Sequence, residues 1–170
     1  MELNTNDLAL LILRLAIAYV FLHGAWMISR NETVRDRSVK RTAILFASSP
    51  YRDNMTIAKI SAYVGFALMY LGSIGLILGL ATRISAALLL IFTVPGIVVH
   101  LRERDQAIAL VESVSKYIDK ADQSQTELLK WSAYAGHQSS ANKNYALLGA
   151  ALFFILASDP HGSFALDALY

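Results

Sequence analysis

Residues 57–100 read IAKISAYVGFALMYLGSIGLILGLATRISAALLLIFTVPGIVVH, and this stretch decides the fold. After the lysine near its start, its only formal charge is Arg83. Thr82-Arg83 divides the stretch into two apolar runs, 57–81 and 84–100. As helices they would be about 37 Å and about 25 Å long, against a hydrocarbon core of roughly 30 Å, so the second crosses with little tilt. Because lipid offers no hydrogen bonds to the backbone, the runs predict a membrane-spanning helical hairpin that turns at Thr82-Arg83.

The composition agrees with a membrane protein. The chain has 170 residues, of which 55% are hydrophobic and 16% charged, with a mean hydropathy of +0.44. An average soluble domain has about 25% charged residues. The absence of cysteine excludes a disulfide framework, a thiolate metal site and a dithiol redox mechanism. The length predicts one domain, residues 1–170, and the net charge of +2 is too small to indicate a nucleic-acid partner.

Two further apolar runs complete the expected fold, an all-α membrane protein built as a four-transmembrane-helix bundle. Residues 8–28, LALLILRLAIAYVFLHGAWMI, would form a helix of about 31 Å. No basic segment of a cleaved signal precedes this run, so we expect it to remain as an anchor. The last span, about 144–158, has an apolar part of only about 20 Å. It must therefore extend into polar flanks or be shielded by the other helices.

Long polar loops are expected after the first and third spans, at 29–56 and 101–143. In the first loop, the apolar island 43–47 is expected to dip into the membrane interface. In the second loop, apolar residues at helical spacing predict an amphipathic segment, about 105–133, that lies on the membrane or packs on a partner. Residues 136–144 would then connect to the last span.

The basic residues predict the orientation. Thirteen of the 15 Lys and Arg residues lie in or beside the two long loops, and the other two are Arg14 and Arg83. Basic loops stay on the cytoplasmic side. We therefore expect both long loops in the cytoplasm and both termini outside, in a prokaryotic plasma (inner) membrane.

Four charged residues share the outer end in this topology: Arg14, Arg83, Asp159 and Asp167. An arginine near lipid is costly unless an anion pairs with it. We hypothesise that one of these arginines pairs with one of these carboxylates as a charge-assisted hydrogen bond. The alternative is that each charge meets lipid headgroups and water.

A ligand site is hypothesised at the cytoplasmic ends of spans one and three, from His23, Trp26 and His100. Imidazoles can ligate haem or hydrogen-bond a quinone carbonyl. A haem is not expected, because no further ligand pattern is present and four short spans leave little room. No cofactor is firmly implied, and a quinone fits the nearby aromatics better. The alternative is an interfacial histidine within an aromatic belt.

Elsewhere the sequence predicts no metal-ligand cluster, catalytic triad or nucleotide loop, and it expects His137 and His161 to be solvated. Gly72, Gly75 and Gly79 lie on one helical face and predict close helix packing. That contact belongs inside the bundle or between two copies. Pro95-Gly96 is expected to kink the third span.

Three short motifs resemble the DoxX-like family. Leu13-Arg14-Leu15 with Phe21-Leu22-His23-Gly24 is similar to its first-helix signature. The segment from Gly72 to Thr82-Arg83 resembles its second-helix motif, and Leu166-Asp167-Ala168 its closing segment. The chain departs from many members at Met69-Tyr70, where they carry a glutamate, and at Ser73, where they carry a glycine.

The resemblance implies a four-helix membrane protein with redox associations. Relatives include the small subunit of an archaeal thiosulfate:quinone oxidoreductase, and others sit in complexes with superoxide dismutase and a sulfurtransferase. The expected function is a membrane subunit that is quinone-linked or docks a soluble oxidoreductase. The alternatives are a non-catalytic scaffold or assembly subunit and a small-solute carrier that works as an oligomer. Whether the chain is catalytic stays open.

Overall fold

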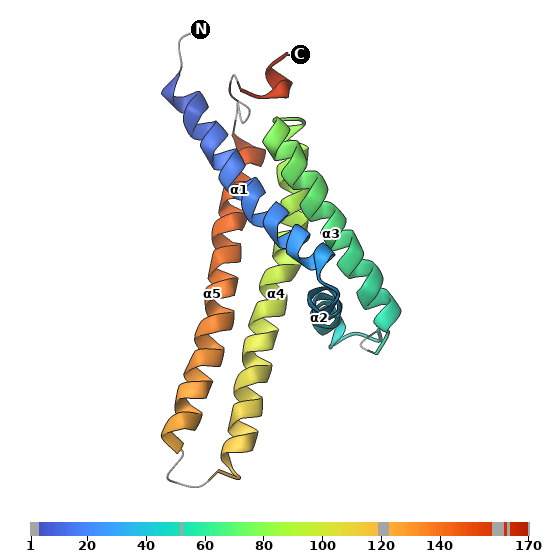
Figure 1. Cartoon of the computed structure of the whole chain (residues 1–170), viewed down its shortest axis with the longest axis vertical. Helices are drawn as coiled ribbons and strands as arrows, with labels where there is room; N and C mark the ends of the chain where they lie inside the picture. The colour runs from blue at the N-terminus through green and yellow to red at the C-terminus, as the bar shows by residue number, and fades with distance from the viewer. Residues whose placement is uncertain (1–3, 52, 119–122, 158–161, 163, 170) are drawn as a thin grey trace.

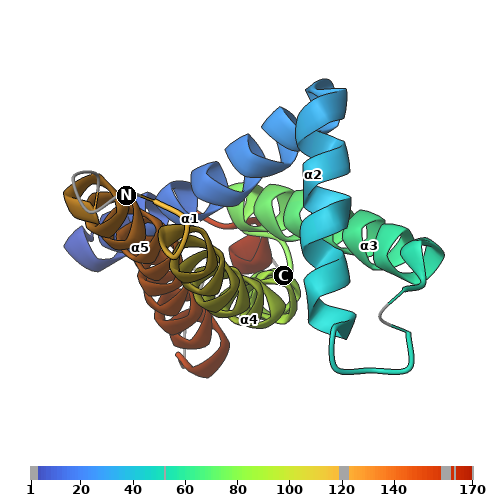
Figure 2. The same ribbon diagram turned by 90° about the horizontal axis from the view of Figure 1, so that it is seen from below.

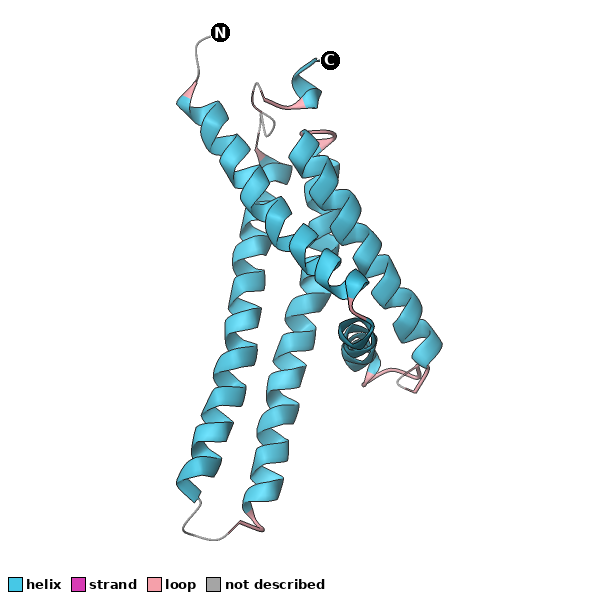
Figure 3. Cartoon of the chain, viewed as in Figure 1, coloured by secondary structure: helices cyan, strands magenta, loops and turns pink. Residues whose placement is uncertain are grey.

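The computed structural model describes residues 4–51, 53–118, 123–157, 162 and 164–169. The described elements, all helical, are α1 (Thr5–Arg30), α2 (Glu32–Ala43), η1 (Ile44–Phe46), α3 (Met55–Leu78), α4 (Thr82–Ser115), α5 (Gln123–Leu156) and η3 (Leu166–Leu169). Figure 3 shows no strand in this part of the chain. The all-helical prediction is therefore confirmed. Among the described helices, α1, α3 and α4 are long and apolar enough to cross a membrane.

The helices form a long antiparallel pair with two shorter helices packed against one half of it. Figure 1 shows α4 and α5 side by side along the long axis, with α1 and α3 beside their upper half. The start of α1, the turn between α3 and α4, and η3 all lie at the same end of the molecule (Figure 1). The short helix α2 is seen end-on in Figure 1 and lengthwise in Figure 2, so it lies across the long helices.

The core joins four helices at the level where α1 and α3 pack on the long pair. All four helices supply large buried side chains to it: Ile17 and Phe21 from α1, Met69 and Leu76 from α3, Leu89 from α4 and Phe154 from α5. Buried alanines between them allow close approach of the helices. Large apolar side chains also cover the outside, such as Leu71, which is 62% exposed. An apolar exterior of this kind needs lipid around it.

The turn between α3 and α4 lies slightly earlier than predicted. α3 ends at Leu78, and Gly79 caps it with φ +61°, a left-handed conformation that glycine adopts without strain. Thr82 and Arg83, the predicted turn residues, are instead the first two residues of α4. α4 then continues through Pro95 as one helix.

Two of the three predicted packing glycines lie where α3 meets α4. A Cβ at Gly72 would lie 2.7 Å from Leu89 Cγ, and a Cβ at Gly75 would overlap with Ser85 Oγ. Glycine therefore lets these helices approach closely, as in other membrane helix pairs. Because this face is covered within the chain, it is not available to a second copy.

The predicted loop 101–143 is mostly helix, so the expected amphipathic segment 105–133 and connector 136–144 do not exist as separate elements. α4 and α5 have 34 residues each, which corresponds to about 51 Å. Both helices are therefore about 20 Å longer than a hydrocarbon core of about 30 Å is thick. We call the polar end of α4 and the polar start of α5 the arms. The prediction failed because polar residues of one arm bond to polar residues of the other, as in the ion pair of Lys130 with Glu112 at 2.6 Å.

The first predicted loop, 29–56, also contains a helix. Asn31 begins α2 by accepting a hydrogen bond from the backbone N–H of Val34 at 3.2 Å. The apolar island 43–47 ends α2 and forms η1. α2 runs across the long helices rather than along them. Its basic side chains include Arg35, Arg37, Lys40 and Arg41.

Candidate functional site

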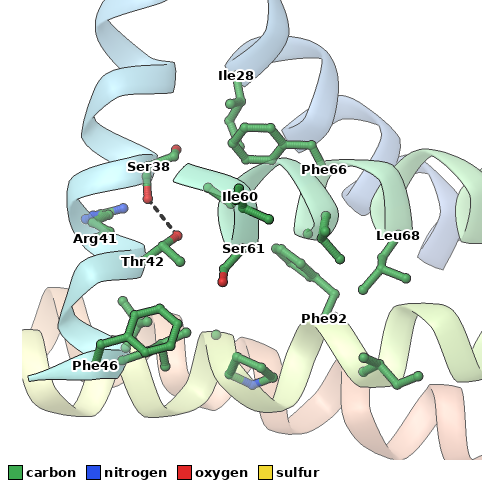
Figure 4. A pocket seen from close by; sticks show the side chains of 18 of the residues that line it. Ile28, Ser38, Arg41, Thr42, Phe46, Ile60, Ser61, Phe66, Leu68 and Phe92 are labelled. Atoms are coloured by element: carbon green, nitrogen blue, oxygen red, sulfur yellow. Dashed lines mark hydrogen bonds between the residues drawn. The ribbon is translucent and has the colours of Figure 1, made fainter. Parts of the chain in front are cut away.

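A cavity of about 540 Å³ lies between α1, α2, α3 and α4. Figure 4 shows that its labelled side chains come from several helices and that its two ends differ. Ser38, Arg41 and Thr42 of α2 line one end, whereas Phe66, Leu68 and Phe92 line the other. The cavity therefore has a polar mouth and an apolar chamber.

Arg41 and His100 carry the chemistry of the polar mouth. Arg41 forms an ion pair through Nε with Glu103 Oε1 at 2.7 Å, which leaves its two Nη groups for other acceptors. His100 directs Nδ1 toward Glu103 Oε2 at 3.6 Å. The other ring nitrogen, Nε2, is therefore the one available to a molecule in the cavity. The mouth thus offers hydrogen-bond donors beside an apolar space.

The apolar chamber is shaped by close packing and by one missing hydrogen bond. A Cβ on Gly65 would lie 3.2 Å from the ring of Phe92, so glycine leaves room for that ring. Phe92 packs edge-on against Phe21, with centroids 6.0 Å apart. Pro95 has no N–H for the carbonyl of Ile91 one turn earlier, and both residues line the chamber.

Arg102 ties η1, which lines part of the cavity, to α4. Its Nη1 donates to the carbonyl oxygens of Ile44 and Leu45 at 2.7 and 3.0 Å. The Ile44 carbonyl also accepts a hydrogen bond from the backbone N–H of Ala47, so it has a partner within η1 as well. An arginine from α4 thus holds η1 beside the cavity that Leu45 and Phe46 line.

Next to the polar mouth, three side chains with nitrogen atoms surround the carboxylate of Glu103. In addition to Arg41 and His100, His137 of α5 directs Nδ1 to Glu103 Oε2 at 3.4 Å. The centroids of the two imidazole rings lie 6.3 Å apart. The carboxylate is only 12% exposed. The expectation that His137 is solvated is wrong, because α5 continues past it and packs it against α4.

At the end of the molecule where α1 begins, Arg14 is completely buried. Its Nη2 donates to the carbonyl oxygen of Phe164 at 3.2 Å, and Asp167 is near enough to attract its charge. The structure thus brings together Arg14 and Asp167, two members of the predicted charge cluster. Arg83 donates to the carbonyl oxygen of Ala157 at 2.9 Å. Asp159 lies outside the described residues.

The predicted ligand residues are separated. His23 is exposed and stacks on Tyr19 with ring centroids 5.6 Å apart. Trp26 is 51% exposed, and the guanidinium of Arg30 lies 5.0 Å above its ring. Of the predicted trio only His100 lines the cavity. The other two face outward, as residues of an aromatic belt do. His161 lies outside the described residues.

Sequence reasoning missed Arg41, Glu103 and His137. It placed all three in polar loops, where a side chain has no defined neighbour. One signal was available: His100 and Glu103 are three residues apart and share a face if the third helix continues. His137 gave no local signal, because only the pairing of α4 with α5 brings it to Glu103.

Comparison with known proteins gives a family. A model of the DoxX family matches residues 9–101, more than half of the chain. The matched segment contains most of α1, all of α2 and α3, and the part of α4 that lines the cavity. No curated protein and no solved structure matches the chain. The family match and the apolar helices confirm the resemblance, and the chain is an integral membrane protein that belongs to the DoxX family.

Proposed function

We propose that this protein is a membrane subunit that binds a quinone and docks a soluble oxidoreductase. The cavity is the observation that carries the proposal. Its volume of about 540 Å³ lies in the usual range for small-molecule sites, about 300–1,000 Å³. Apolar lining with a few polar groups at one end is also typical of such sites.

The chemistry of the lining fits a quinone head and tail. A quinone ring is flat and apolar, and its carbonyl oxygens only accept hydrogen bonds. The Nη groups of Arg41 are donors at the mouth, whereas Phe66 and Phe92 offer apolar faces in the chamber. A sugar or a free ion would lose its hydrogen bonds to water in that apolar chamber and find few partners in exchange.

The proposed topology places the cavity near the cytoplasmic side of the membrane. In it α5 makes the fourth crossing over about 144–158, as part of one domain, and α2 lies at the cytoplasmic surface of a prokaryotic plasma membrane. Its basic side chains then meet anionic headgroups, and both termini are outside. The cavity would open at the inner leaflet, where quinones and their tails are dissolved.

The long arms of α4 and α5 favour the docking part of the proposal. They extend about 20 Å past the bilayer. Near their tips, large apolar side chains are exposed, including Tyr117 at 91% and Trp131 at 65%. Exposed apolar groups beyond the lipid mark sites for protein contact. A non-catalytic scaffold would use the same arms without a quinone.

The test is extraction of bound quinone from the protein purified in mild detergent, with identification by mass. We expect a quinone to copurify with the wild-type chain. Ser61→Phe would fill the cavity from α3 and should remove the quinone. Leu71→Phe, on the outward face of the same helix, is the matched control and should leave it bound.

Two results would contradict the quinone. One is a wild-type sample that carries phospholipid alone, which would make the cavity a lipid site. The other is equal quinone in Ser61→Phe and the wild type, which would place the quinone elsewhere. In either case a copurifying soluble protein would still support the scaffold function.

A further inference from the structure

Three ligating side chains converge where α4 and α5 leave the membrane. His100 and Glu103 lie one turn apart on α4, and His137 faces them from α5. The Nδ1 atoms of His100 and His137 lie 3.6 and 3.4 Å from the same oxygen, Glu103 Oε2. One ligand atom from each residue lies within 4.8 Å of the other two.

This spacing matches tetrahedral zinc. Zinc bonds to nitrogen and oxygen are about 2.0–2.2 Å long, so neighbouring ligand atoms in a tetrahedron lie about 3.4 Å apart. Two histidines and one carboxylate are a common zinc ligand set, and they leave a fourth position open. The distances to Glu103 Oε2 therefore need little adjustment to hold one ion.

Two of the ligand atoms have no other function in the fold. His100 Nδ1 and Glu103 Oε2 are buried and have no hydrogen-bond partner. A buried polar atom without a partner destabilises the fold, because it has lost its hydrogen bonds to water and gained none in the protein. A cation between His100 Nδ1 and Glu103 Oε2 would give both atoms the partner that no other protein atom provides.

Arg41 orients the carboxylate from the other side. Its ion pair with Glu103 Oε1 at 2.7 Å leaves Oε2 as the single donor atom to a metal. Such outer contacts fix the direction of a ligand. The positive charge of Arg41 also weakens attraction for hard cations held only by charge, such as Mg²⁺. Two imidazoles favour zinc and its transition-metal neighbours instead.

We propose that His100, Glu103 and His137 bind one Zn²⁺ ion, with the fourth position open to water or to a small anion. The ion would clamp α4 to α5 at the base of the long arms. It would sit beside the cavity, since His100 belongs to both places and Arg41, which lines the cavity, pairs with the ligand Glu103. The inference goes beyond the proposed quinone function and does not depend on it.

The test uses the full chain in detergent after treatment with a chelator. We expect one Zn²⁺ per chain, retained through gel filtration, and a Co²⁺ derivative with the absorption of a four-coordinate ion. His137→Ala and Glu103→Gln should each weaken zinc binding at least about 100-fold, since loss of an outer-shell contact alone costs about 10–100-fold. His23→Ala, an exposed histidine on α1, is the matched control and should bind zinc normally.

A second measurement on the wild type covers variants that do not fold. We expect Zn²⁺ to protect His100 and His137 from chemical carbethoxylation while His23 remains reactive. Zinc well below one per chain at saturation, normal binding by His137→Ala, or equal modification with and without zinc would overturn the site. No quinone enters these measurements, so their failure leaves the proposed function standing.

Discussion

Asp167 near the end of the chain caps α4 through Thr82. Its Oδ2 accepts hydrogen bonds from the backbone N–H of Thr82 at 2.8 Å and from its hydroxyl at 3.0 Å. Its Oδ1 accepts from the N–H of Ala81 at 2.7 Å. Ala81 has no side chain that caps the helix, so a distant carboxylate supplies what an N-cap residue normally provides. Because Asp167 also attracts Arg14, it links α1 to this turn.

Asp167→Asn should lower the free energy of unfolding by about 2–3 kcal/mol. The change removes the negative charge that attracts the buried Arg14 and places an N–H₂ group against the N–H donors at the start of α4. Thermal or denaturant unfolding in detergent measures the loss. Asp36→Asn on the exposed side of α2 is the control, with an expected change within about 0.5 kcal/mol. Equal effects of the two changes would show that the cap does not stabilise the fold.

Arg14→Met tests whether Arg14 and Asp167 act together. In this background the buried charge is gone, so Asp167→Asn should cost only the helix cap, about 1–2 kcal/mol. Unfolding of the wild type, both single variants and the double variant gives the coupling energy. Effects that add within about 0.5 kcal/mol would refute the coupling.

Gly79→Ala should destabilise the protein, because its backbone is left-handed and its neighbours are close. An L residue in this conformation costs about 1–2 kcal/mol. The new Cβ would also overlap with Arg14 Nη1 and lie 2.5 Å from Ala165 Cβ. Gly136→Ala is the contrast: nothing lies within 4 Å of its Cβ, and alanine should stabilise α5 by about 0.5–1 kcal/mol. The expectation fails if the two variants shift the melting temperature in the same direction.

The arms of α4 and α5 should loosen in acid. A hydrogen bond and the charge of Lys130 lower the pKa of Glu112. A carboxyl whose pKa is lower in the folded state stabilises it above the ordinary glutamate pKa, and this contribution disappears as the pH falls through the lowered value. Hydrogen exchange of residues 108–118, compared between the wild type and Glu112→Gln, should differ near neutral pH and converge in acid.

Glu127→Gln is the matched control for the arms. Glu127 raises the pKa of Lys130 less than Glu112 does, so its loss should change exchange less. In alkali the contribution of the pair should also disappear as the pH rises through the raised pKa of Lys130. A difference between the wild type and Glu112→Gln that is the same at all pH values would rule out the pairing as its cause.

The sequence predicted the three long apolar helices α1, α3 and α4 well and the polar parts poorly. The runs that contain Leu76 and Leu89 are apolar over many residues, and a long apolar run has only the helix available to it in lipid. The region of Glu103 and His137 is polar, and polarity alone does not distinguish a loop from a helical arm. Two arms that bond to each other, as Arg104 does to Gln138 at 2.7 Å, stay helical without an apolar face toward lipid.

By itself, the sequence determined that this chain is helical, lies in a membrane and resembles the DoxX family. Hydropathy and short motifs are local properties, and they can be read without knowing which segments meet. Only the tertiary structure decided that Asp167 caps α4, that Arg41 and His100 share a cavity, and that His137 reaches Glu103. Those contacts join residues far apart in the chain, and they depend on how helices pack, which no local pattern records.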